Sequence, residues 1–283
     1  MKIIEPKVEL WKQGNDTKAH VARCARVCYG KETGNDTSLI KRLLDSKHWS
    51  MFRHESVYAI IPVHERELKD YPLLVLSSPY IKTHTYNCNV YVATNGQFIL
   101  DKLYHKFIEL INMYRVTEDE FSNTEIGFNM MRYTFCVDTQ ISTSRELNRV
   151  SPNNIAEKST RYVYEDGNIC RPHWISKEEA ELFNNDNNII LNEAINVYLN
   201  GCKRDFEEYK ILVDKYKIRR QDARGKLPLD TATRCIYTYS TKEWFDIIKK
   251  RVYNTTGKAH PNATIICKLI EQELNELGYE IKI

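Results

Sequence analysis

Apolar residues follow two different periods along the chain, and these periods predict both strands and helices. Short, nearly continuous apolar runs are typical of strands, and they lie at residues 1–12, 56–63, 89–94, 133–139 and 235–239. Apolar residues that recur every three or four positions are typical of helices, and they lie at residues 17–29, 37–47, 97–114, 188–217, 241–251 and 261–277. Because the two kinds mix without a regular β-α-β alternation, the sequence predicts an α+β fold.

Capping signals support several of these helices. Ser176 precedes Glu179 by three residues, which is the capping-box spacing that begins a helix. Gly30 and Gly278 stand just after two helical stretches, where glycine is favoured. Gly201 lies near the middle of the longest stretch and predicts a bend or a break there. That stretch also has more apolar surface than one sheet face needs, which favours packing against a second subunit.

The composition is that of an ordinary globular protein. Of the 283 residues, 42% are apolar and 28% are charged, and no repeat or Pro/Gly-rich linker divides them. We therefore predict a single domain over residues 1–283. No apolar run approaches the roughly 18 residues of a membrane helix, and the N-terminus has no secretory pattern, so we expect a cytoplasmic protein. The net charge of +3 is too small to indicate a nucleic-acid-binding protein.

The eight cysteines form no metal or redox motif. None belongs to a C-x-x-C pair or to a zinc spacing, so we predict no metal site. Cys24 and Cys28 lie four residues apart on a predicted helix, where they form either half of a metal site or two small core residues; the second interpretation is favoured. No cysteine has a setting that would activate it as a nucleophile.

Common phosphate-binding and nucleophile motifs are also missing. The chain has no G-x-G-x-x-G, no P-loop and no G-x-S-x-G elbow, so a bound phosphate would depend on arginines. Residues 145–162 (RELNRVSPNNIAEKSTRY) concentrate polar side chains and predict a loop that runs into a helix. Guanidinium groups and a serine hydroxyl suit a phosphate, and a carboxylate suits sugar hydroxyls. The alternative is a solvated helix face held by ion pairs.

This segment resembles the signature of the flavin-dependent thymidylate synthases, R-H-R followed seven residues later by S-x-R-Y. The corresponding residues here are Arg149-Val150-Ser151 and Ser159-Thr160-Arg161-Tyr162. Glu157 matches the extended pattern, whereas Glu146 stands where the family usually has glutamine. Further segments resemble the family's motifs in the same order, namely residues 25–30 (ARVCYG), 48–54 (HWSMFRH), 222–228 (DARGKLP) and Glu243-Trp244 with Arg251 and His260-Pro261.

The resemblance covers nearly the whole chain and implies a fold, an assembly and a reaction. The implied fold is a twisted, mainly antiparallel sheet flanked by helices, and the implied assembly is a homotetramer with active sites at subunit interfaces. The implied reaction is the reductive methylation of dUMP to dTMP. FAD is the implied cofactor, and NADPH and methylenetetrahydrofolate are the implied co-substrates. This chemistry requires no cysteine nucleophile.

The resemblance also assigns the nucleotide side of the site. The residues that it implies for dUMP binding are Glu146, Glu157, Ser159, Arg161, Arg224 and Arg251. It places Arg251 over the pyrimidine ring, where a cation would stabilise negative charge that develops on the uracil. Arg251 is therefore the implied catalytic residue.

The flavin side departs from the family pattern. The positions that the resemblance implies for FAD are His54, Ser56, Arg149, Val150, Ser151, Glu157, Ser240 and Asp246. Val150 and Ser151 replace the usual histidine and second arginine, and Arg53 replaces a glutamate. The changes at Val150 and Ser151 remove hydrogen-bond donors and a positive charge from a site for an anionic cofactor, whereas Arg53 adds a cation that could compensate. We therefore expect nucleotide binding to be better preserved than flavin binding.

Other functions stay open at this point. The chain is either an active synthase, a family member with altered chemistry on another pyrimidine nucleotide, or a catalytically silent nucleotide-binding homologue. A nucleic-acid-binding protein is disfavoured because the basic run at residues 215–220 is short and ends a predicted helix, where cations are favoured. We expect a pyrimidine nucleotide and further copies of the chain as partners, and neither a membrane nor a nucleic acid.

Overall fold

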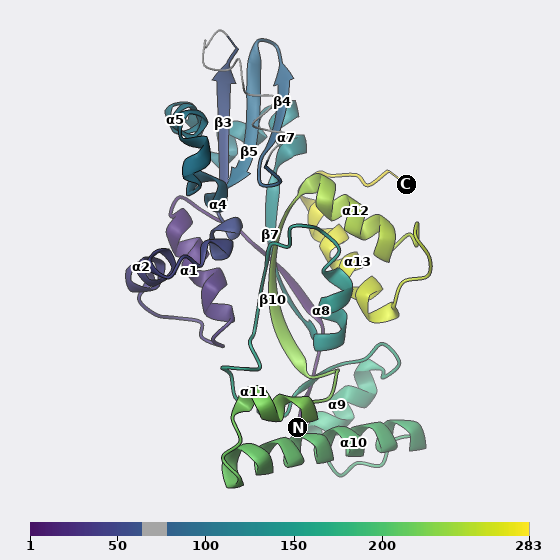
Figure 1. The fold of residues 1–283 in the computed structure, drawn as a ribbon. Helices are drawn as coiled ribbons and strands as arrows, with labels where there is room; N and C mark the ends of the chain where they lie inside the picture. The colour runs from purple at the N-terminus through teal and green to yellow at the C-terminus, as the bar shows by residue number, and fades with distance from the viewer. Residues whose placement is uncertain (64–77, 283) are drawn as a thin grey trace.

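The computed structural model describes residues 1–63 and 78–282. Two four-stranded antiparallel sheets and a two-stranded parallel sheet form the framework, and helices pack against them (Figure 1). The predicted α+β class with mainly antiparallel strands is confirmed. The strands form more than one sheet, however, whereas the resemblance implied one. The single-domain organisation stays a prediction.

The central sheet carries most of the candidate site. Its strands, in spatial order, are β2 (Lys7–Trp11), β7 (Arg132–Gln140), β10 (Ala232–Ser240) and β8 (Ile155–Glu157). One face packs against α8 (Ile141–Leu147), α12 (Thr241–Arg251) and α13 (Pro261–Glu276), and the other against α1 (Thr17–Val27). Because side chains alternate between the two faces of a strand, Tyr237 and Phe135 point into the first core and Cys136 and Ile236 into the second.

The direction of the two longest strands places the helices that follow them. β7 and β10 are antiparallel, and α8 and α12 begin directly after them. The two helices therefore start from opposite ends of the sheet and cover the same face. Ser240 and Glu243 begin α12 with a capping box. This arrangement brings Arg251, at the end of α12, to the last turn of α8.

The second sheet lies above the first in Figure 1. Its strands, in spatial order, are β4 (Lys82–Tyr86), β5 (Asn89–Asn95), β3 (Ser56–Pro62) and β6 (Arg115–Val116). Its two faces are covered by α5 (His105–Met113) and by α6 (Glu118–Ser122) with α7 (Glu125–Met130). On the side of α1, the chain also forms α2 (Asp36–Asp45) and the 3₁₀ helix η1 (Trp49–His54).

The third part of the fold lies at the lower end of the central sheet. The short strands β1 (Ile3–Ile4) and β9 (Ile169–Cys170) pair in parallel there. The helices around them are α9 (Lys177–Asn185), α10 (Glu193–Lys210), α11 (Arg220–Ala223) and the 3₁₀ helix η5 (Arg224–Lys226). The predicted capping box is present, since Ser176 and Glu179 bond reciprocally at the start of α9.

Most predicted elements are confirmed within a few residues, but four predictions were wrong. Residues 1–12 form two strands, because Pro6 lies between them and has no N–H to donate. The predicted helix 97–114 is divided into α4 (Gly96–Ile99), a 3₁₀ turn (Lys102–Tyr104) and α5, because the Asp101 side chain accepts from the Leu103 amide and starts a new helix.

The other two errors concern the longest helix and the polar segment. α10 runs unbroken through Gly201, around which there is open space, and it becomes a π-helix only at Ile211–Lys215. The stretch 188–217 starts later than predicted because Asn192 caps α10. Within residues 145–162 the order is reversed: helix α8 runs into a loop, and the loop ends in strand β8.

Candidate active site

Three of the predicted residues form one charged cluster at the end of α8. Arg251 Nε donates to the Glu146 carbonyl at 2.9 Å, and Arg251 Nη2 lies 3.1 Å from Glu146 Oε2. Arg149 Nη2 lies 3.2 Å from the same carboxylate oxygen. The Arg251 side chain is 12% exposed, whereas Arg149 is 48% exposed. The cluster therefore offers two guanidinium groups and one carboxylate at a partly open position.

Glu157 lies apart from this cluster, at the end of β8. Its Oε1 accepts hydrogen bonds from the Ser144 and Thr233 hydroxyls, each at 3.1 Å. Burial raises the pKa of Glu157, and the hydrogen bonds from Ser144 and Thr233 oppose that shift. These two hydroxyl residues are supporting positions that the sequence analysis missed. No local signal marked them, because α8 (ISTSREL) and β10 (ATRCIYTYS) carry several polar residues each.

Ser159, Arg161 and Arg224 form a second group. The loop after β8 turns at Ser159, whose hydroxyl accepts from the Arg161 amide at 3.3 Å. Arg161 Nη2 donates to Gln221 at 3.3 Å, and Arg224 Nη1 donates to Thr160 at 3.4 Å. Both guanidinium groups are exposed, and these long single contacts leave most of their donors free for a ligand. The structure thus brings α11 and this loop together, as a phosphate cradle would require.

No hydrogen bond or ion pair joins the two groups in the part of the chain that the structure describes. The first group lies where the last turn of α8 meets the end of α12, and the second where the loop after β8 meets α11 and η5. A single chain therefore presents two partial arrangements of nucleotide-side residues.

The flavin-side residues His54 and Ser56 are buried inside the fold. His54 Nδ1 bonds to the Thr238 hydroxyl at 2.8 Å, and His54 has no solvent-exposed surface. Burial, reinforced by His20 and the Arg132 and Arg53 cations, lowers the pKa of His54 to about 3. The Ser56 backbone N–H donates to Gln13 Oε1, and the Ser56 carbonyl accepts from Gln13 Nε2. His54 reaches no surface, whereas Ser56 lies in the wall of a cavity of about 750 Å³ that β2, β3 and α6 also line.

Other flavin-side positions are also tied into the fold. Ser240 caps α12 and accepts from Lys82 Nζ at 2.8 Å. Val150 packs against the core on the α12 side of the central sheet. Ser151 and Asp246 are exposed. Arg149 is already paired with Glu146, as described above.

Arg53, which replaces the family's glutamate, is held by three partners. It donates to Gln97 Oε1 at 2.6 Å, to the Asn153 carbonyl at 2.7 Å and to the Tyr80 hydroxyl at 2.9 Å. An anionic dinucleotide needs exposed donors and uncompensated positive charge. Arg149 alone meets that requirement, since its guanidinium is half-exposed and has one contact. The other flavin-side residues of one chain do not fit it, because they are buried, apolar, exposed without positive charge or bonded within the fold.

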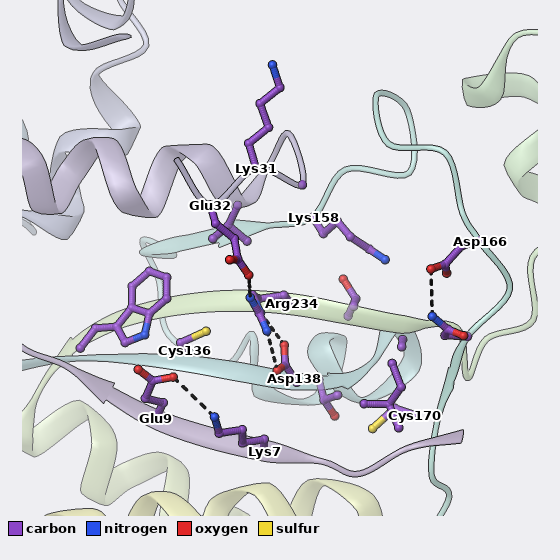
Figure 2. Close-up of a pocket in the computed structure, with 18 of the residues that line it drawn as sticks. Lys7, Glu9, Lys31, Glu32, Cys136, Asp138, Lys158, Asp166, Cys170 and Arg234 are labelled. Atoms are coloured by element: carbon purple, nitrogen blue, oxygen red, sulfur yellow. Dashed lines mark hydrogen bonds and ion pairs between the residues drawn. The ribbon is translucent and has the colours of Figure 1, made fainter. Parts of the chain in front are cut away.

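A wide cavity of about 670 Å³ lies on the α1 side of the central sheet, and Figure 2 shows its lining. None of the predicted site residues lines it. The Arg234 guanidinium donates two hydrogen bonds to the Asp138 carboxylate, at 2.7 and 2.9 Å, and one to Glu32 at 3.5 Å. Lys7 is paired with Glu9 at 3.8 Å. The charged side chains that line this cavity thus largely compensate one another.

The cysteines have no activated setting. Burial raises the pKa of Cys136 and of Cys170, both in the wall of this cavity, to about 12, and that of Cys202 to about 11. Cys24 is buried among apolar residues, which supports its interpretation as a core residue. Among residues 1–63 and 78–282, no group of three or more metal-ligating side chains is gathered.

Membrane-spanning helices were searched for in the same residues. No helix in the described ranges is both long and apolar enough to cross a bilayer.

Comparison with protein families gives one match. The model of the thymidylate synthase complementing protein family, Thy1, matches residues 122–277, which is more than half of the chain. The chain belongs to this family. The predicted resemblance to flavin-dependent thymidylate synthases is thereby confirmed, and membership indicates an enzyme of the methyltransferase type. The matched residues include Glu146, Arg224 and Arg251, whereas the likeness of segments 25–30 and 48–54 lies outside the match and stays a prediction.

Solved structures with a related fold include two enzymes. A UMP/dUMP methylase, PolB, from Streptomyces cacaoi bound with 5-Br dUMP is 16% identical, covers 98% of this chain and 93% of its own, and has a TM-score of 0.45. Thymidylate synthase X (ThyX) from Helicobacter pylori with FAD and dUMP is 14% identical, covers 54% and 73%, and has a TM-score of 0.39. These values are too low to transfer a substrate or cofactor to the Thy1 chain. No curated protein matches it.

Proposed function

We propose that this Thy1 protein methylates carbon 5 of dUMP, giving dTMP, with methylenetetrahydrofolate as the one-carbon donor. The observation that carries the proposal is the family match over residues 122–277, which includes both groups of nucleotide-side residues. In this proposal Ser159, Arg161 and Arg224 hold the phosphate, because their donors are largely free. Arg251 stabilises charge on the pyrimidine, and Glu157 accepts hydrogen bonds from the sugar.

FAD and NADPH are proposed on family membership alone. When bound, FAD would supply the hydride that completes the methyl group. The flavin-side residues of this chain do not themselves form a cradle for it, so we assign them no step. Flavin content of the purified protein, measured by fluorescence after denaturation, tests this part of the proposal separately.

We also propose that the protein is a single domain that assembles as a homotetramer, with the active site shared between chains. The two nucleotide-side groups, which no hydrogen bond or ion pair joins among residues 1–63 and 78–282, support a shared site. Ile190 and Val197, which are 87% and 69% exposed, support packing of the α10 region against another subunit.

The activity is tested by release of tritium from dUMP labelled at carbon 5, in the presence of methylenetetrahydrofolate, NADPH and added FAD. Tritium release together with dTMP formation supports the proposal. Its absence, with no binding of dUMP by calorimetry, contradicts it. A protein that binds dUMP without turnover is the silent homologue instead.

A mixing experiment tests the shared site. At dUMP concentrations well below Kd, Arg224→Ala and Arg251→Ala proteins are each expected to have much lower activity than the wild type. If each site takes these arginines from different chains, dissociating and reassembling the two proteins together restores part of the activity. A fully active monomer in light scattering, or no recovery in reassembled mixtures, contradicts the shared site.

A second candidate is a family member with altered chemistry on another pyrimidine nucleotide. The pairing of Arg53 with three internal partners favours it, because this substitution is built into the fold. UMP and dCMP in the same labelled assay discriminate the two candidates.

A further inference from the structure

The outer strand β2 of the central sheet has an unpaired edge. β2 is an end strand of that sheet and pairs with β7 alone. Among residues 1–63 and 78–282, no backbone hydrogen bond joins residues 7–11 to any other element. The N–H and C=O groups of alternate residues along this edge are therefore open to pairing with another strand.

The side chains of β2 differ between its two faces. Lys7 and Glu9 lie on the α1 side, where they are 66% and 49% exposed. Val8 and Leu10 lie on the opposite side and pack against the core that α13 covers. Glu9 has only long ion pairs within the chain, 3.8 Å to Lys7 and 3.7 Å to Arg23. Because exposed pairs of this kind contribute little to stability, both are readily exchanged for a better-placed partner.

A second copy of β2 fits this edge in one register. Two antiparallel copies related by a twofold axis keep each side chain on its own face, and directly opposite residues share a face, so one residue of β2 lies on the axis. With Lys7 or Glu9 on the axis, like charges lie opposite each other. With Leu10 there, neither charge has a partner of opposite sign. Only Val8 on the axis sets Lys7 of each copy opposite Glu9 of the partner subunit.

We propose that β2 pairs antiparallel with β2 of a second copy of this chain, with Val8 on the twofold axis. The two Lys7–Glu9 pairs lie on the α1 side, and the two Val8 side chains meet on the α13 side. Charged residues on edge strands guard against indiscriminate pairing, and here they disfavour the other registers. This interface is separate from the α10 surface, and its place within a homotetramer rests on that part of the proposed function.

Charge reversal tests the pairing. Lys7→Glu and Glu9→Lys each set like charges opposite each other twice, so we expect either variant to weaken the interface about tenfold or more. In sedimentation velocity, each should form assemblies half the wild-type size at concentrations where the wild type stays intact. Lys41→Glu is the matched control, because it changes the net charge equally at an exposed position on α2, and it should sediment like the wild type.

Mixing the two variants separates contacts between chains from contacts within a chain. Each variant supplies the charge that the other lacks, so an equimolar mixture should recover the wild-type size. The like charges that each variant carries within its own chain remain in the mixture, so they cannot account for recovery. Assemblies of wild-type size for both single variants, or no recovery in the mixture, overturn the pairing.

A cysteine cross-link tests the register. Val8→Cys brings two thiols together at the axis, with the Cα atoms about 4.5–5.5 Å apart, which suits a disulfide. Leu10→Cys offsets the two thiols by four residues, or about 13 Å along the strands. Oxidation should therefore link two chains through Val8→Cys and not through Leu10→Cys, with the wild type as the control for native cysteines such as exposed Cys88. A link through Leu10→Cys instead overturns the register.

The results also separate this inference from the proposed function. Absence of dUMP turnover in a protein that shows the loss and recovery of assembly contradicts the proposed activity and supports the pairing. A wild-type tetramer that neither charge reversal divides contradicts the pairing and leaves the homotetramer in place. A wild type that is monomeric at every concentration contradicts both.

Discussion

Two buried histidines make the stability of this protein depend on pH. His20 Nε2 bonds to the Thr134 hydroxyl at 3.3 Å, Thr134 bonds to Thr238 at 2.8 Å, and Thr238 bonds to His54 Nδ1 at 2.8 Å. This chain of polar groups crosses the core between α1, the central sheet and η1. Its histidines are only 4% and 0% exposed, so a proton on either ring would be a buried charge.

Both rings are held neutral. Burial lowers the pKa of His20 from 6.5 to about 4. The Arg23 cation has a smaller effect in the same direction, and Glu55 opposes the shift. The pKa of His54 is lowered to about 3. As the pH is lowered from about 7.5 to about 5, His20 and His54 therefore bind protons in the unfolded chain but stay neutral in the folded chain. As the pH is lowered to about 5, this difference reduces the free energy of unfolding by about 2 kcal/mol for each histidine, or about 4 kcal/mol for the pair.

The measurement is urea unfolding across this pH range, comparing the wild type with His20→Gln/His54→Asn. The amide nitrogens of glutamine and asparagine take the approximate places of Nε2 and Nδ1, but they do not titrate. Buried carboxylates such as Glu157 and Glu165, whose pKa values are raised by burial, act with the opposite sign and remain in both proteins. We expect the wild type to lose about 4 kcal/mol more than the variant. Parallel pH profiles for the two proteins would refute the reasoning.

Three further predictions concern the candidate site. Arg224→Ala should weaken dUMP binding about tenfold or more by calorimetry, because a guanidinium with free donors is lost; equal affinity would exclude it from the phosphate site. Arg251→Ala should lower turnover about a hundredfold in initial-rate assays while changing the Kd for dUMP less, and an equal loss in both would assign it to binding alone. Val150→His with Ser151→Arg should give no gain in FAD affinity by fluorescence titration, because Val150 packs against the core; a gain would indicate an eroded flavin site.

The sequence predicted those parts of the fold in which local chemistry and tertiary packing agree. The strands β7 and β10 are rich in aromatic, β-branched and other apolar residues and lie in the middle of the central sheet, so burial on both faces matches their composition. Two helix boundaries were wrong because a single polar side chain overrides a periodic pattern. Asp101 starts a new helical turn within an apolar helical period, and Asn192 delays the start of α10.

Residue spacing alone indicated the site less completely than the fold. The contact of Arg251 with Glu146 depends on two helices that leave opposite ends of the central sheet, and no local pattern encodes such a meeting. The burial of His54 could likewise not be predicted from the sequence, because a lone histidine in a short 3₁₀ segment belongs to no periodic pattern. Sequence motifs predict which residues take part, whereas the distances between these residues come from the tertiary fold.

The flavin-side substitutions are better explained as a remodelled pocket than as decay of a cofactor site. Decay would leave buried donors and charges without partners, which is costly. Arg53 instead has three hydrogen-bond partners, drawn from α4, from the loop before β8 and from the segment before β4. Ser240 is likewise bonded to Lys82, and Val150 adds apolar surface to the core. Because Arg53, Ser240 and Val150 are each held by contacts within the fold, we expect that restoring the motif at Val150 and Ser151 would disturb the core at Val150 without recreating a flavin cradle.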